Sequence, residues 1–182
     1  QGKQLVATIS TSLAGVSIDV SDSSEHVSAR FDAALRTGEQ IGNQALQASA
    51  HMQRGRALYE QGDLESALRA FQQAATINKE TGENHALAVN YSDIAFAYVR
   101  MQQHDEAIRY LKGSLAAFDH VWGSLTTDER RVAFGDTFDD VLHELQHQLL
   151  MISTKGRHAG IEALEYAEHA RSRALERLLA QQ

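Results

Sequence analysis

The sequence predicts an all-α protein built from repeated pairs of antiparallel helices. The first observation behind this prediction is a fixed period. Residues 55–74 (GRALYEQGDLESALRAFQQA) and 95–114 (AFAYVRMQQHDEAIRYLKGS) align with every position 40 residues apart, as 55 is from 95. A period between about 20 and 50 residues is typical of repeat architectures. The second observation is that none of the 182 residues is Pro, while Ala, Leu, Gln and Glu are abundant, which favours helix throughout the chain.

Small residues recur where the two helices of a pair must approach each other. Gly55 aligns with Ala95 in the first helix of each pair, and Ala67 aligns with Ala107 in the second. Ala67 and Phe71 are spaced i, i+4, so they share one helix face. We therefore expect Ala67 and Ala107 to lie at helix contacts and Phe71 to lie in the core.

Glycines mark the ends of the predicted helices. Gly62 is followed by Asp63, which suits a turn that needs a positive φ and then a side-chain acceptor at the start of the next helix. Gly42 and Gly82 are 40 residues apart and mark the corresponding helix ends in the two repeats.

The elements follow in order from these signals. Residues 1–24 are rich in Ser, Thr, Val and Ile, so we expect either a degenerate first helix or a disordered tail. Residues 25–121 are expected to form the repeats, and 122–182 a long C-terminal helical pair. The expected helices are at about 25–41, 43–61, 64–80, 83–102, 105–121, 128–152 and 161–180.

Over residues 25–121 the order of small, aromatic and small residues resembles the tetratricopeptide repeat (TPR). The usual TPR period is about 34 residues, and the longer period here resembles the subclass with an extra turn in each helix. The Pro that follows the second helix in that family is missing. The resemblance implies a right-handed superhelical solenoid whose first helices line a concave surface that binds a protein or peptide partner.

Carrying that concave surface over to this chain gives a set of candidate partner-binding residues on the two first helices. Their mixture of apolar side chains and two arginines would suit a helix or extended peptide with apolar anchors and an acidic group. The alternative is that several of them pack inside the superhelix, because solenoid helices bury both sides. The candidates are Met52, Arg56, Tyr59, His85, Ser92, Phe96, Val99 and Arg100, with Ser49 and Val89 beside them.

The C-terminal part has a second resemblance. Residues 126–150, a short loop and residues 162–180 are similar to the helical pair that precedes CHAT domains, which are caspase-like cysteine protease modules. This resemblance implies that the chain is the sensor or regulatory part of a larger protease, whose catalytic domain would be a partner in the same parent chain. A standalone TPR adaptor is the alternative. The residues that carry the resemblance are Tyr166, Ala167, Glu168, Ala170, Arg171, Arg173, Ala174, Leu175 and Leu178.

One motif points to a different class of function. His143-Glu144-Leu145-Gln146-His147 matches HExxH, in which two His one helical turn apart bind zinc and the Glu activates a water. Glu165 or Glu168 would be a possible third ligand. With Leu145 at the centre of the apolar face, however, both His fall near the opposite face. We therefore favour two polar residues on an outer surface over a zinc-dependent hydrolase, and expect neither a catalytic nor a metal site.

Composition excludes further classes of function. The absence of Cys excludes disulfides, thiolate metal sites and a cysteine nucleophile in this sequence. A net charge of −7 gives no general basic surface for nucleic acid. No apolar run approaches the roughly 20 residues that span a membrane. We expect a non-enzymatic, cytoplasmic interaction module that needs no cofactor.

Overall fold

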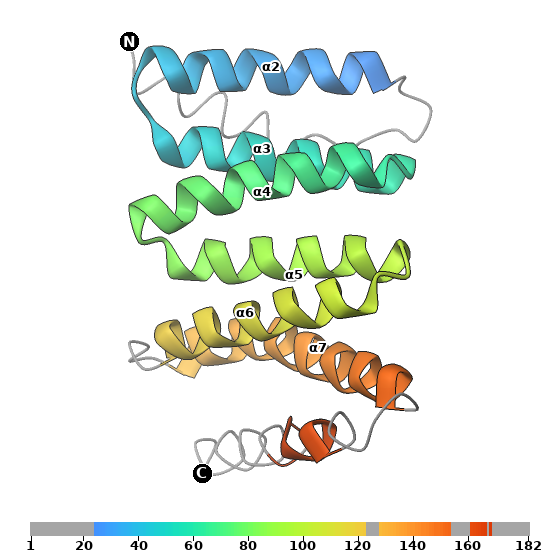
Figure 1. Ribbon diagram of the computed structural model, residues 1–182. Helices are drawn as coiled ribbons and strands as arrows, with labels where there is room; N and C mark the ends of the chain where they lie inside the picture. Colours follow the sequence, from blue (N-terminus) through green and yellow to red (C-terminus); the bar gives the residue numbers. More distant parts are fainter. Residues whose placement is uncertain (1–23, 123–127, 154–160, 167, 169–182) are drawn as a thin grey trace.

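The computed structural model describes residues 24–122, 128–153, 161–166 and 168. They form a stack of helices in which each helix runs antiparallel to the one before it (Figure 1). The described residues contain no β-strand. The expected all-α solenoid of antiparallel helix pairs is therefore confirmed. The labelled helices are α2 (Ser24–Gln40), α3 (Gln44–Gln61), α4 (Leu64–Thr81), α5 (Asn84–Arg100), α6 (His104–Trp122) and α7 (Asp128–Ser153), and residues 161–166 and 168 are also helical.

The helices pack in chain order, and this order determines where a binding surface can form. Each helix from α2 to α7 packs against its neighbours in the chain, and α3 additionally touches α5. α3 and α5 are the first helices of consecutive repeats. Their contact brings equivalent faces of two repeats together.

The turns follow the glycine pattern, with one exception. Gly42, Gly62 and Gly82 have φ of 64°, 85° and 75°, as the turns require. At the next equivalent position Gln102 adopts φ 58°, which is unfavourable for a residue with a Cβ. Met101 and Gln102 belong to this turn, so α5 ends at Arg100, two residues before the expected end.

N-terminal caps also differ between repeats. Asp63 accepts a hydrogen bond from the backbone N–H of Ser66 over 3.2 Å, and Asn43 accepts one from Leu46 over 3.0 Å. Glu83 is the N-cap residue of α5, but its side chain makes no capping hydrogen bond. The cap expected at Asp63 is confirmed.

Close helix approach depends on small residues, as expected. Ala67 and Ala107 are both fully buried, and Phe71 is 1% exposed. A Cβ added to Gly55 would lie only 2.5 Å from two ring carbons of Phe71. The Phe71 ring therefore occupies the space that a side chain at position 55 would need.

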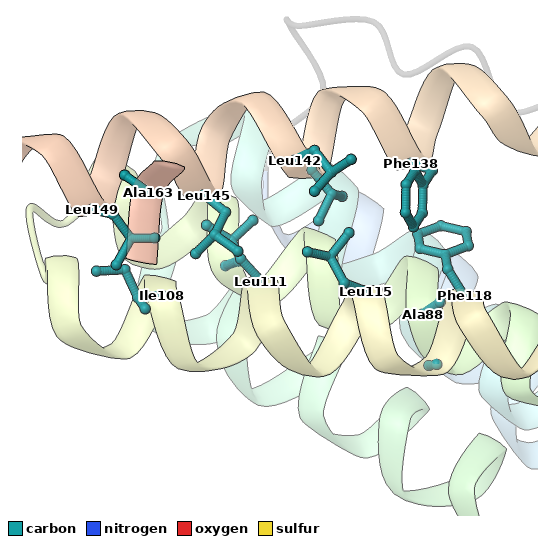
Figure 2. Close-up of a cluster of buried hydrophobic side chains, with 13 residues drawn as sticks. Ala88, Ile108, Leu111, Leu115, Phe118, Phe138, Leu142, Leu145, Leu149 and Ala163 are labelled. Atoms are coloured by element: carbon teal, nitrogen blue, oxygen red, sulfur yellow. The ribbon is translucent and has the colours of Figure 1, made fainter. Parts of the chain in front are cut away.

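Two clusters of buried side chains contribute to the core of the described residues. The first joins α3, α4 and α5 through residues such as Leu58, Phe71 and Ile94. The second joins α5 and α6 to α7, as Figure 2 shows for the face of α7 that meets α6. Five α7 residues are buried there: Phe138, Val141, Leu142, Leu145 and Leu149.

Some sequence expectations fall outside the described residues. These are the N-terminal segment up to residue 23, Ala167, and the last helix beyond residue 168, which holds most of the residues that carry the resemblance to the helical pair before CHAT domains. Ala163 is described and is 5% exposed in the second core cluster.

Candidate functional site

Three of the residues expected to bind a partner meet in one pocket between the first helices of consecutive repeats. Arg56 and Tyr59 come from α3 and Phe96 comes from α5. The pocket has a volume of about 220 Å³. We call it the α3–α5 pocket; its lining residues are Arg56, Tyr59, Glu60, Phe71, Asp93 and Phe96.

An ion pair joins the two helices at this pocket. Arg56 donates from Nε and Nη2 to the same oxygen, Oδ2 of Asp93, over 3.3 and 3.2 Å. The Asp93 side chain is 19% exposed, against 44% for Arg56. Burial raises the pKa of Asp93, and the Arg56 charge and hydrogen bond partly oppose that rise. Both hydrogen bonds from Arg56 therefore converge on one oxygen of the Asp93 carboxylate.

The second arginine is also held by the protein itself. Arg100 donates from Nη1 to the backbone oxygen of Tyr59 over 2.8 Å. Its guanidinium lies 4.5 Å from the centre of the Tyr59 ring, within the range of a cation–π interaction. Arg100 therefore fixes the end of α3 and the Tyr59 ring beside the pocket. Arg56 and Arg100 are thus both already bound by groups of the protein itself.

The remaining candidate residues lie outside the pocket lining. Met52 and Val99 are partly buried. Ser92 is only 3% exposed and donates to the backbone oxygen of Val89, so it does not present its hydroxyl to a partner. His85 is exposed at the start of α5, with its ring 6.4 Å from that of Phe118, and partial burial lowers its pKa.

Sequence reasoning missed two acidic residues of the pocket and assigned a third residue only to the core. Asp93 and Glu60 were not singled out, and Phe71 was expected to be buried, which it is. A signal for Asp93 was present, because it precedes Phe96 by three residues and so shares its face of α5. Its pairing with Arg56 requires the tertiary contact between α3 and α5.

Two residues of the HExxH motif, Glu144 and Leu145, take part in the packing of α7 against α6. His143 and His147 are exposed, whereas Leu145 is fully buried, so the expected orientation is confirmed. Glu144 accepts a hydrogen bond from Nε2 of the buried Gln148 over 2.6 Å. Oε1 of Gln148 in turn lies 2.6 Å from Nδ1 of His104 on α6. Glu144 thus supports the residue that links the two helices.

Two further observations concern metals and membranes. Among the residues that the structure describes, no group of three or more His, Asp or Glu side chains is arranged to hold a metal ion. Within the same part of the chain, no helix combines the length and apolar character needed to cross a membrane.

Comparisons with known proteins agree with this architecture. Residues 46–120 match the family model of the tetratricopeptide repeat. No match is found among curated proteins. Among solved structures, the chain is similar to the crystal structure of the apo form of RapI, with a TM-score of 0.56 and 14% sequence identity. The match covers 92% of this chain and 61% of that chain, and at this identity it shows the fold alone.

Proposed function

We propose that this chain, a solenoid whose residues 46–120 match the tetratricopeptide repeat, is a binding module that holds a segment of a protein partner in the α3–α5 pocket. The observation that carries the proposal is the convergence of Arg56, Tyr59 and Phe96 on one pocket. These residues come from two different repeats, and the solenoid brings their equivalent faces together. Repeat proteins commonly bind their partners on the concave surface of the solenoid.

The pocket lining defines the chemistry of the partner segment. Phe96 and Tyr59 are partly buried, and they offer aromatic surface to one apolar side chain. Beside them, Asp93 and Glu60 offer carboxylate acceptors. Because Arg56 and Arg100 are already engaged, the acidic group expected from the sequence is not the best fit. We propose an apolar anchor flanked by a Lys or Arg, which the net charge of −7 would also attract.

The test begins with the capture of a partner by the intact chain. The affinity of that partner is then measured by isothermal titration calorimetry. Phe96→Ala should weaken partner binding by at least about tenfold, which is about 1.4 kcal/mol, because binding energy concentrates in a few anchor residues. Circular dichroism should show unchanged helix content.

His85→Ala is the matched control, since His85 is on α5 but lies against Phe118 and outside the pocket. It should leave the affinity unchanged. Equal affinities for the parent chain and Phe96→Ala, with both folded, would remove the α3–α5 pocket as the binding site.

We further propose that residues 25–121 are the partner-binding repeats and that residues 122–182 form the junction to a CHAT-type protease domain in a larger cytoplasmic protein. Support for the junction comes from the sequence resemblance around Tyr166. Tyr166 is partly buried against the second core cluster, and Lys112 on α6 forms an ion pair with Glu162. The reading frame of the parent gene tests this. A downstream domain with a Cys and His pair supports the protease, whereas a stop codon after Gln182 supports a standalone adaptor.

A further inference from the structure

A larger pocket lies on the other set of helices. It has a volume of about 390 Å³ and lies between α4 and α6, the second helices of consecutive repeats. These two helices flank α5 in the stack (Figure 1). Ile94 and Tyr91 of α5 contribute to its lining. We call it the α4–α6 pocket; none of its lining residues is shared with the α3–α5 pocket.

Two small residues line this pocket at positions where the neighbouring repeat has a larger residue. Gly113 lines the pocket, and the equivalent position 40 residues earlier is Gln73. Ala75 also lines it, and its equivalent one repeat later is Leu115. A Cβ on Gly113 would lie 3.2 Å from a ring carbon of Tyr91, so Gly113 lets that ring approach the α6 backbone.

The aromatic wall of the pocket is held rigidly. The Tyr110 ring stacks on Tyr98 with centres 5.6 Å apart and meets Tyr91 edge to face at 5.8 Å. The Arg109 guanidinium lies 4.8 Å from the centre of the Tyr110 ring. A wall fixed in this way loses little conformational entropy when a planar ligand packs against it.

The charge of the pocket is opposite to that of the whole chain. Lys79 and Arg109 line it, and its lining contains no carboxylate, although the net charge of the chain is −7. Lys79 is exposed and forms no ion pair with any residue that the structure describes. Arg109 pairs with Glu106, which is outside the lining. Lys79 therefore favours an anionic group at the pocket, and Arg109 adds positive charge beside it although it is also paired with Glu106.

We propose that the α4–α6 pocket binds a small aromatic carboxylate. The ring would pack against Tyr91 and Tyr110 beside Gly113, with the carboxylate toward Lys79 and Arg109. A volume of about 390 Å³ falls in the range of small-molecule sites. A free aromatic acid and the C-terminal Phe or Tyr of a peptide share this chemistry. The site is independent of partner binding at the α3–α5 pocket.

The test titrates the full 182-residue chain with phenylacetate and follows amide shifts by NMR. We expect saturable binding with the largest shifts at Tyr91, Gly113 and Tyr110. Phenylacetamide, which has the same ring without the charge, should bind at least tenfold more weakly. The double variant Lys79→Gln and Arg109→Gln should lose at least tenfold in phenylacetate affinity. Both residues are exposed, so the variant should keep its fold.

Arg69→Gln provides the matched control, because Arg69 occupies the position equivalent to Arg109 one repeat earlier and lies outside the pocket. It should bind phenylacetate like the parent chain, and so should Phe96→Ala. An acetylated Gly-Gly-Phe peptide with a free carboxylate distinguishes the two sources: tighter binding than phenylacetate identifies a chain end, and weaker binding a free acid. Absence of saturation by either probe, equal affinity for phenylacetamide, or an unchanged double variant would overturn the proposal.

Discussion

The contact between Gly55 and Phe71 allows a quantitative test of how the repeats pack. In the first repeat Gly55 faces Phe71, and in the next repeat the equivalent positions hold Ala95 and Leu111, which are both fully buried. A larger residue on the first helix is thus accompanied by a smaller one on the second. This exchange predicts that the two positions are energetically coupled.

The magnitude follows from two opposing effects. Ala is favoured over Gly inside a helix by about 1 kcal/mol. A Cβ at position 55, however, would lie 2.5 Å from two carbons of the Phe71 ring, which is 1% exposed and has little room to withdraw. Such overpacking costs about 1–3 kcal/mol. We expect Gly55→Ala alone to be neutral or to destabilise by up to about 2 kcal/mol.

In a chain that already carries Phe71→Leu, the clash is removed and Gly55→Ala should stabilise by up to about 1 kcal/mol. Urea unfolding followed by circular dichroism, on the parent chain, both single variants and the double variant, gives the coupling free energy. We expect about 1–3 kcal/mol. Additive effects within about 0.5 kcal/mol would refute the packing argument.

Three further predictions concern the turns and the ion pair. Gln102→Gly should stabilise the chain by about 1 kcal/mol in urea unfolding, because Gly tolerates φ 58° without strain; a loss of stability would contradict the turn assignment. Asp63→Ala should cost about 1 kcal/mol, whereas Glu83→Ala should cost much less because Glu83 makes no cap bond; equal costs would contradict this comparison. Arg56→Gln should raise the pKa of Asp93 further, because burial raises this pKa and Arg56 opposes the rise. A carboxyl group whose pKa is raised on folding contributes stability at low pH, and this stability is lost as the pH rises through the pKa of the folded state. In Arg56→Gln the loss should therefore extend to higher pH. Urea unfolding over a series of pH values measures this, and a pH profile identical to that of the parent chain would contradict the prediction.

Local sequence signals predicted the fold because each repeat is defined by contacts close in the chain. Glycines at 42, 62 and 82 set three of the turns, and Ala67 with Phe71 set the face of α4 that is buried. The turn at Gln102 shows that the backbone can follow the repeat even where the residue that suits it is missing. Helix-to-helix packing then fixes the rest of the backbone.

The candidate site was less predictable, because it depends on contacts between repeats. The repeat period does not predict these contacts. Ser92 is buried, Arg56 pairs with Asp93, and Arg100 binds the backbone oxygen of Tyr59. The same limitation applies to the α4–α6 pocket. Its lining includes the small residues Ala75 on α4 and Gly113 on α6, and this combination is visible only after the two helices are placed on either side of α5.

Site-specific photo-crosslinking tests most directly whether a partner occupies the α3–α5 pocket. A photoreactive phenylalanine would replace Glu60, which is exposed and lines that pocket, or Gln73, which is exposed on α4 outside both pockets. In the complex with the captured partner, we predict a crosslink from position 60 and none from position 73. A crosslink from position 73 with none from position 60 would contradict the assignment of the binding surface.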